Sequence, residues 1–498
     1  MRKKTKAPSR RNAVRLERDP LGSLAVPAGA YYGIQTRRAM LNFPISGRRL
    51  PPVFIRAYAH IKSAAAGVNV SLGLLDRRRG TAIRRAAEEV LAGRHADQFV
   101  VDVYQAGAGT SQNMNLNEVL ANRAIEILGG RRGDYSVVHP NEHVNLSQST
   151  NDTFPSALRV AILLALPGLL RSLRDCEAVL RGLERRFRKT VKTARTHLQD
   201  AVPITLGQEF GAYASMVGRS ARRVEDAAAP LGRLNLGGTA AGTGLNAHPR
   251  YASLVTRALS RRTGLRLRPA ADPVEATMST ADFAAFSSSL RGAALDLGKI
   301  ASDLRLLASG PTAGLAEIEL PAVQPGSSIM PGKVNPVMCE MLNMVCFQAV
   351  GCDEAVAWAS GAAQLELNVM LPLIAHNVLE AMALLESAVG AFTRRCLRGI
   401  RADAARCRLY FERSPALSTA LAPVLGYARA ADLAKEAVRT GKTIARLAIE
   451  TGLVEPRVLR RALDPDRLTR PGILRAVRPG RLRGRGRGAS GSARSRRD

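Results

Sequence analysis

The sequence predicts a mainly α-helical protein built around a central bundle of long helices. Aromatic residues make up only 4% of its 498 residues, whereas apolar residues make up 46%. Ala and Leu dominate the apolar set, which favours helices because strands are enriched in β-branched and aromatic residues. An apolar content of this size also excludes a chain that is disordered throughout.

The clearest single element is a long amphipathic helix over Asp282–Ser309. Its apolar residues recur at alternating steps of three and four for about four heptads, which is the spacing of a helix seam; they are Phe283, Phe286, Leu290, Ala293, Leu297, Ile300, Leu304 and Leu307. Thr280 or Ser279 can cap its start, and Gly310 with Pro311 ends it. With a rise of about 1.5 Å per residue, this helix is about 42 Å long. One domain rarely covers such a helix alone, so we expect a bundle that is shared between subunits.

Composition predicts three folded domains between two basic ends. The five segments are a disordered basic arm (1–12), an N-terminal domain (13–147), a domain of long helices (148–404), a small helical domain (405–470) and a disordered Arg/Gly-rich tail (471–498). The third segment is the predicted bundle. Its further apolar patterns run through Pro155–Arg188, Glu209–Ala228 and Glu340–Arg395.

The net charge of +32 invites a nucleic-acid interpretation. The two ends carry +6 and +8 of this charge, so +18 remain for the rest of the chain. The body has no zinc-finger, RRM or KH signature, and the tail motif RLRGRGRG lacks the interleaved aromatic residues that stack on bases. We therefore do not expect the tails to bind nucleic acid. The basic residues are 63 Arg but only 10 Lys, so a Lys in a polar loop is a candidate for a specific role.

Cysteine spacing and hydropathy predict a soluble cytoplasmic protein. The six cysteines form no CxxC pair, which favours buried free thiols in a reducing compartment. No stretch reaches 18 apolar residues, and the longest, near Val160–Leu170, is broken by Pro167. Arg10 and Arg11 hint at a twin-arginine signal, but charged residues follow them instead of an apolar stretch.

Four polar loops interrupt the apolar patterns. They share hydroxyls, side-chain amides, exposed backbone N–H groups and a single Lys, and they are Gly107–Asn115, His139–Asp152, Arg195–Asp200 and Pro325–Pro336. Such groups bind carboxylates through directed hydrogen bonds without a metal. Loops that enter long helices also bring helix N-termini, which attract anions. The four loops therefore predict a site for a small polyanion.

Each loop also has a plainer interpretation as helix caps and turns, which Ser, Thr and Asn commonly form. The stretch Gly326–Lys333 resembles a phosphate-binding loop, but five residues separate its glycines and Val334 stands where Ser or Thr would bind magnesium. His139 and His143 resemble a metal pair, but Pro140 spoils the helical spacing and no HExxH order exists. We therefore expect no metal.

Taken together, the four loops resemble the aspartase/fumarase superfamily of fumarate-forming lyases. The resemblance covers about residues 15–472, and it rests on GAGTSQNMNLNEV, HPNEHVNLSQSTND, RTHLQDAVPITLGQEF and PGSSIMPGKVNP. The last of these marks only the superfamily, whereas the four together narrow it to aspartases and class II fumarases. The resemblance implies a three-domain protomer in a homotetramer whose core is a bundle of long helices from four subunits. It also implies active sites drawn from three chains, a dicarboxylate substrate and no cofactor.

Within the superfamily, several stretches favour the aspartase reaction, which is the reversible anti elimination of ammonia from L-aspartate to give fumarate. Ser149-Thr150-Asn151 resembles the STND pattern of aspartases, where fumarases more often have SSND. Gly314–Ile318 and Glu366–Met370 also look aspartase-like, whereas Thr153–Pro155 and Leu236–Ala240 are common in fumarases. Class II fumarase, which interconverts malate and fumarate, stays the alternative.

The resemblance assigns substrate-binding roles residue by residue. Removing the Cβ proton makes the adjacent carboxylate a doubly charged aci-carboxylate, which needs converging hydrogen-bond donors. By resemblance these donors are Thr110, Ser149, Thr150 and Ser328. Lys333 and Asn335 hold the other carboxylate with help from Thr196, and the side-chain oxygen of Asn151 accepts from the substrate ammonium.

Ser327 matches the catalytic base of the family. A lone Ser hydroxyl is far too weak an acid for this role, so we expect backbone N–H groups and Lys333 to stabilise its alkoxide. The loop contains three residues that could serve as hinges, which are Gly326, Pro331 and Gly332. They predict a lid that closes over the substrate, and a rigid turn is the alternative.

Two further sets of residues have assignments by resemblance. His197 matches the site histidine and Glu340 its acidic partner, a pair that would set the tautomer and charge of the imidazole ring. A histidine at this position is compatible with both activities. His139 and Asn141 align with a secondary anion site described for fumarases, and the alternative role is capping at a helix entry.

Overall fold

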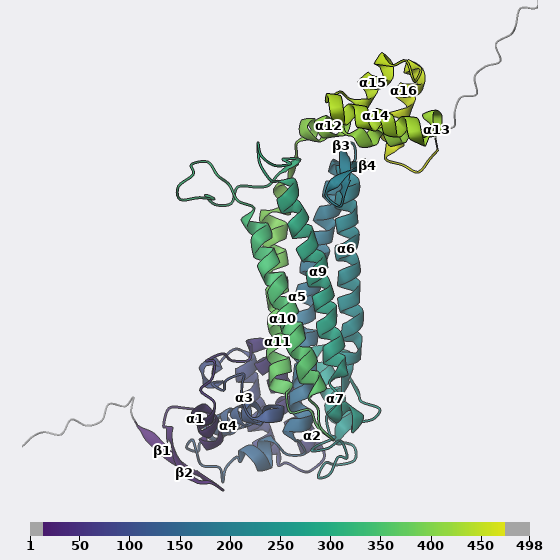
Figure 1. Ribbon diagram of the computed structural model, residues 1–498. Coiled ribbons are helices and arrows are strands. Elements are labelled where there is room, and N and C mark those ends of the chain that lie inside the picture. The colour runs from purple at the N-terminus through teal and green to yellow at the C-terminus, as the bar shows by residue number, and fades with distance from the viewer. Residues whose placement is uncertain (1–12, 474–498) are drawn as a thin grey trace, which may run out of the picture. The chain divides into compact units, whose positions relative to one another are not determined.

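Helices dominate the computed structural model, which describes residues 13–473 (Figure 1). This confirms the predicted mainly α-helical class. The predicted basic arm lies outside the described residues, as does the predicted tail beyond residue 473.

The chain divides into two compact units. The first comprises the residues up to Leu183 together with Phe210–Arg401. The second comprises Glu184–Glu209 together with the residues from Ala402 onward.

The first unit begins with a hairpin and a group of four helices. The antiparallel strands are β1 (Val14–Asp19) and β2 (Gly22–Pro27), and the helices are α1 (Ile34–Asn42), α2 (Pro52–Ser71), α3 (Arg77–Leu91) and α4 (Thr110–Ile127). Helix α2 packs against both α3 and a later helix, α7 (Tyr251–Thr263). Helix α4 is buried along most of its length, so its first turn is held in a fixed place.

Five long helices lie side by side in the rest of this unit (Figure 1). They are α5 (Thr150–Arg186), α6 (Leu206–Ala228), α9 (Ala281–Leu307), α10 (Val337–Gly361) and α11 (Leu371–Arg395). Helix α10 packs against both α9 and α11. The shorter elements are β5 (Arg233–Leu234) and β6 (Arg268–Pro269), which pair in parallel, and α8 (Glu275–Met278), β7 (Ile318–Glu319) and β8 (Arg401–Ala402).

Helix α9 is the helix that the apolar seam predicts. All eight seam residues are buried. It ends at Leu307, two residues before the predicted end, and Thr280 is its N-cap residue. The cap contact comes from Ser279, whose hydroxyl accepts from the N–H of Ala281 at 3.3 Å, because the Thr280 hydroxyl instead accepts from the buried amide of Asn368 at 3.0 Å.

The apolar pattern over Glu340–Arg395 is not one helix but two, α10 and α11, separated by a tight connection. Leu365 has a positive φ of 49°, which a helix does not allow. Asn368 then donates to the carbonyl of Ala359 at 3.0 Å and accepts from the N–H of Met370 at 2.8 Å. These contacts close α10 and start α11.

The second unit combines one hairpin with short helices. Its strands are β3 (Val191–Thr196) and β4 (Gln199–Thr205), and its helices are α12 (Ala404–Arg413), α13 (Ala422–Leu425), α14 (Tyr427–Thr440), α15 (Ile444–Glu450), α16 (Pro456–Ala462) and α17 (Pro465–Leu468). Its core contains Phe411, Leu421 and Ile444 from these helices and Val191 from the hairpin. The hairpin is therefore anchored at its base while its tip is exposed.

Two helices in the described residues, α5 and α11, are long and apolar enough to span a membrane by those two criteria. In their most apolar stretches, however, 67% and 61% of the residues are buried inside the structure. Burial of this extent is what core helices of a bundle show.

Glu89 on α3 is a partly buried acid whose ion pairs stabilise the first unit. Arg123 of α4 donates to it twice, from Nε at 2.7 Å and from Nη2 at 2.9 Å. These hydrogen bonds, with a further one from His95, lower the pKa of Glu89 to about 2 from an ordinary value of 4.5. We expect Glu89→Gln to lower the free energy of unfolding by about 2 kcal/mol at pH 7.

The dependence of this effect on pH has a definite sign. Because the pKa of Glu89 is lower in the folded state, its contribution is complete above pH 4.5 and is lost as the pH falls toward 2. The gap in thermal midpoint between wild type and Glu89→Gln should therefore narrow below pH 4.5. Glu436→Gln, which removes an exposed pair with Arg439, is the control and should have no measurable effect. A gap that is the same at pH 7 and pH 3.5 would contradict this account.

Candidate active site

The first turns of α4 and α5 lie together and bring predicted substrate ligands to one place. Thr110 is the first residue of α4, and Thr150 is the first residue of α5. One turn into α4, Asn113 donates from Nδ2 to the hydroxyl of Thr150 at 3.0 Å. Two helix N-termini therefore converge where the predicted carboxylate would bind.

Close packing at Gly109 makes this convergence possible. Gly109 precedes α4 and has a positive φ of 87°. A Cβ atom at this position would overlap the ring of Phe154 on α5. Only glycine can therefore let the two helix starts approach this closely.

Asp152 holds the backbone of the Ser149–Asn151 segment in place through hydrogen bonds. Its carboxylate accepts from the N–H of Ser149 at 2.9 Å, from Gly237 at 2.9 Å and from Thr239 at 3.2 Å. Burial raises the pKa of Asp152 to about 7 in spite of these donors. The segment is thus tied to the glycine-rich loop at Gly237–Thr239.

Asn151 has a defined amide orientation. Its Nδ2 donates to the carbonyl of Ala240 at 2.7 Å. Its backbone N–H is also bound, by the hydroxyl of Ser149 at 3.2 Å. The side-chain oxygen of Asn151 therefore remains as an acceptor next to Thr150.

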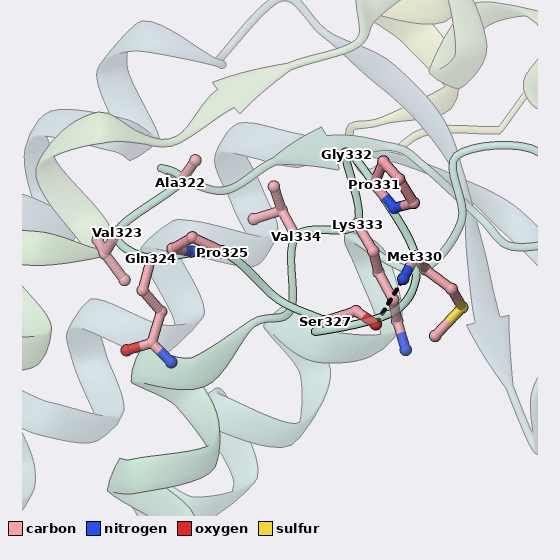
Figure 2. Close-up of a pocket in the computed structure, with 10 residues that line it drawn as sticks. All are labelled: Ala322, Val323, Gln324, Pro325, Ser327, Met330, Pro331, Gly332, Lys333 and Val334. Atoms are coloured by element: carbon pink, nitrogen blue, oxygen red, sulfur yellow. Dashed lines mark hydrogen bonds between the residues drawn. The ribbon is translucent and has the colours of Figure 1, made fainter.

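Ser327 lies in a loop that is tied at its neck (Figure 2). The N–H of Gly326 donates to the carbonyl of Lys333 at 2.8 Å, and Asn335 Nδ2 donates to the carbonyl of Gly326 at 2.6 Å. A Cβ atom on Gly326 would lie 2.5 Å from that Lys333 oxygen, so this neck requires glycine.

Within this loop, the Ser327 oxygen accepts two backbone hydrogen bonds. The donors are the N–H groups of Ile329 at 3.2 Å and Met330 at 3.0 Å. Ser327 and Lys333 both line a cavity of about 510 Å³, and Figure 2 shows its ten lining residues. Ser328 is exposed on the same loop, and Glu340 lies in the first turn of α10 directly after it.

Thr196 and His197 lie at the exposed tip of the hairpin in the second unit. His197 and Leu198 have positive φ values of 54° and 59°, which are strained for residues other than glycine. Leu198 is also 72% exposed. Strain and exposure at one tip are typical of a segment with a binding role rather than a packing role.

The His139 and Asn141 pair has the geometry of a cap. The ring Nδ1 of His139 accepts from the backbone N–H groups of Asn141 and Glu142, both at 3.2 Å. The capped turn is Pro140–Val144, and Asn141 is exposed on it.

The first unit separates two of the predicted groups of site residues. The Ser327 loop enters α10 at Val337, whereas the N–H of Ala108, beside the α4 and α5 starts, donates to Val369 beyond the other end of α10 at 2.8 Å. Helix α10 has 25 residues, so these two places lie about 37 Å apart along it.

Comparison with known proteins identifies the family of this chain. A lyase family model matches residues 22–351, and a model of the fumarase C C-terminus matches residues 417–470. The chain belongs to the aspartase/fumarase superfamily. This bears out the resemblance of the four loops, and it makes the protein a lyase.

Relatives of both activities are similar to this superfamily member. An aspartate ammonia-lyase from Bacillus sp is 48% identical over 92% of this chain and 98% of its own length. A class II fumarate hydratase from Thermosynechococcus vestitus is 48% identical over 88% of this chain and 94% of its own. A crystal structure of a fumarate lyase:delta crystallin from Brucella melitensis bound to cobalt superposes with a TM-score of 0.89, at 48% identity, over 92% of this chain and 100% of the other.

Sequence reasoning missed the buried polar residues beneath the α4 and α5 starts of this superfamily member. Lys62 of α2 is fully buried, and it is one of only ten lysines. The signal that could have found it is a Lys inside the otherwise apolar helix pattern AYAHIKSAAAGVNV. Asn145 contacts Lys62 directly, and Asn113 contacts Asn145. In the sequence both are only parts of polar loops.

Proposed function

We propose that the protein is an aspartate ammonia-lyase, which converts L-aspartate reversibly to fumarate and ammonia by anti elimination. The observation that carries the proposal is the orientation of Asn151. Because its Nδ2 donates to Ala240, its Oδ1 is left to accept from the substrate, and an ammonium has three protons to donate. The similarity to aspartate ammonia-lyases supports this, whereas the equal identity to a class II fumarate hydratase makes that activity the second candidate.

The two substrate carboxylates bind at different groups of residues. Thr110, Ser149, Thr150 and the partial positive charge of two helix N-termini hold the carboxylate that gains charge in the transition state, with Ser328 from the loop. Lys333 and Asn335 hold the other carboxylate, together with Thr196. Neutral hydroxyl donors suit the carboxylate that gains charge, because their hydrogen bonds strengthen as negative charge develops and they need no counterion.

Ser327 is the base that removes the Cβ proton. Its oxygen takes the proton, the C–H electron pair forms the double bond, and ammonia leaves from Cα. The two N–H groups that already point at this oxygen, from Ile329 and Met330, stabilise its alkoxide form and so lower its pKa. The loop closes over the substrate as a lid, with its neck at Gly326 and Lys333 as the fixed point.

His197 and Glu340 act as a pair on the leaving-group side. The carboxylate of Glu340 sets the tautomer of the imidazole ring, and the ring contacts the substrate or a site water. Proton and ammonia transfer involve no change of redox state, so this mechanism uses no cofactor.

The complete site requires several chains. The Ser327 loop and the Ser149–Asn151 segment lie about 37 Å apart along α10 in one protomer, so they cannot meet on one substrate. We infer a homotetramer in which three subunits contribute to each site. Exposed apolar side chains along α9 and α10 support this, because a surface of that kind is normally covered by a partner; they are Leu295, Leu306, Met344, Phe347 and Trp358.

We also place the enzyme in the cytoplasm. All six cysteines are free thiols and buried, which suits a reducing compartment. A secondary anion site at His139 and Asn141 is a separate proposal: Nδ1 of His139 accepts from the cap, so its Nε2–H is the ring donor that an anion would meet.

The substrate is tested by following the absorbance of fumarate with L-aspartate and, separately, with L-malate. We expect turnover of L-aspartate and, with malate, a kcat/KM at least about 100-fold lower, because a site built around one charged leaving group rejects a neutral one. The reverse pattern, robust malate turnover with none from aspartate, would replace the proposal by class II fumarase.

A further inference from the structure

Beneath the start of α5 lies a buried amine that the proposed mechanism does not use. Lys62 is 0% exposed, and its Nζ donates to Oδ1 of Asn145 at 2.8 Å. The ammonium also lies 5.3 Å from the centre of the Tyr58 ring, on the same helix. Burying a Lys side chain is costly, so a Lys at this place calls for a role beyond packing.

Asn145 is the centre of a small amide cluster. Its Oδ1 accepts not only from Lys62 but also from Nδ2 of Asn117 at 3.2 Å and Nδ2 of Asn113 at 3.3 Å. Its own Nδ2 donates to the carbonyl of Gln148 at 3.1 Å. Three donors on one oxygen leave no doubt about which way this amide faces.

The cluster in turn orients Asn113. The Oδ1 of Asn113 accepts from the Tyr58 hydroxyl at 2.8 Å, which leaves its Nδ2 to donate to Asn145 and to Thr150. The Thr150 oxygen is thereby an acceptor for Asn113 at 3.0 Å. An oxygen that accepts here keeps its own proton for another acceptor, which is the state needed to bind a carboxylate.

We infer that Lys62 is a positioning residue that acts through Asn145 and Asn113 to hold the Thr150 hydroxyl as a hydrogen-bond donor to the substrate. The inference rests on the proposed function only in that Thr150 binds a dicarboxylate, which holds equally for aspartate, malate and fumarate. Lys62 does not touch the substrate in this arrangement.

The hydrogen bond from Lys62 to Asn145 does not depend on whether the amine of Lys62 is protonated. Burial lowers the pKa of Lys62 to about 7, and the nearby carboxylate of Asp152 opposes this shift. Both the ammonium and the neutral amine can donate to Asn145. The orientation of Thr150 is therefore maintained on either side of neutral pH.

A double-mutant cycle between Lys62→Met and Thr150→Val tests the inference. Methionine keeps most of the length of the side chain but removes the donor, and valine removes the hydroxyl. We expect each single variant to lower kcat/KM by about tenfold or more, mainly through kcat, because an aci-carboxylate binds Thr150 more strongly than the substrate does. We expect the double variant to match Thr150→Val alone within about twofold, because Lys62 has nothing left to orient.

Two outcomes would overturn the inference. One is an unchanged kcat/KM in folded Lys62→Met. The other is a double variant whose loss equals the product of the two single losses, since a purely structural effect of Lys62 would lower activity independently of Thr150. Active-site titration distinguishes a structural defect from a loss of positioning, because a structural defect reduces the number of active sites rather than the rate at each.

Further variants guard against a failure to fold. If Lys62→Met does not fold, Lys62→Gln takes its place in the cycle, and where both fold the glutamine variant should recover part of the activity because it keeps a donor. Ile61→Val, a buried neighbour on the same helix, is the matched control and should leave kcat/KM unchanged. If neither aspartate nor malate is turned over, the proposed function fails. The same double-mutant cycle is then measured on the Kd of fumarate by calorimetry. Non-additive losses of fumarate affinity are still expected, and additive losses would still contradict the role of Lys62.

Discussion

Replacing Ser327 by alanine should lower kcat by about 1,000-fold or more while the protein stays folded and keeps its oligomeric state. Loss of a general base costs two to four orders of magnitude in typical enzymes, and Ser327 is the one hydroxyl that two backbone N–H groups of its loop stabilise. Its side chain makes no contribution to a buried core, because the loop is largely exposed. Turnover of L-aspartate, a calorimetric scan and size-exclusion chromatography measure the three quantities.

Ser328→Ala is the matched control for this prediction. Ser328 is the next residue on the same loop, and its assigned role is binding rather than proton transfer. We expect its loss to reduce kcat/KM by only about ten- to a hundredfold, as for the removal of one hydrogen-bond donor. Near-normal kcat in Ser327→Ala would remove Ser327 as the base, and equal effects of the two variants would make it one binding hydroxyl among several.

Replacing Gly109 by alanine should reduce the free energy of unfolding by about 3 kcal/mol or more. Two costs add up at this position. An L-residue at its φ of 87° loses about 1–2 kcal/mol, and the added methyl group overlaps the ring of Phe154, whose displacement costs about 1–3 kcal/mol. Because Gly109 sets the approach of α4 to α5, kcat/KM should fall as well.

Gly129→Ala separates these two costs. Gly129 follows the other end of α4 and has the same φ of 87°, but nothing lies within 4 Å of a Cβ atom there. Its substitution should therefore carry only the backbone cost, about 1–2 kcal/mol, and leave activity intact. The thermal midpoints of wild type, Gly109→Ala and Gly129→Ala are measured side by side. If both variants lose the same stability, packing against Phe154 is unimportant.

The long helices were predictable because their apolar spacing is a property of the sequence alone. The seam of α9 placed its start within one residue and its end within two. The apolar pattern over Glu340–Arg395 did not mark where α10 ends and α11 begins, although Gly361 and Pro372 stand beside the break. That break depends on contacts of Asn368 with Ala359 and Thr280, which only the folded chain brings together.

The sequence proposes the residues of the candidate site but not their geometry. The four loops named Ser327, Thr150 and Asn151, since their motifs are local. The orientation of Asn151 depends on Ala240, 89 residues away, and the N–H groups on Ser327 depend on the turn of its loop. Lys62 was overlooked because a Lys on an apolar helix gives no sign of which amide it will meet.

The length of α10 also has a genetic consequence. A chain with a defective Ser327 loop still carries an intact Ser149–Asn151 segment at the other end of α10, and a chain with the opposite defect carries an intact loop. In the proposed tetramer, two such chains that assemble together would build some sites entirely from sound parts. Two inactive alleles of this gene would then restore one another's activity when they are expressed in the same cell.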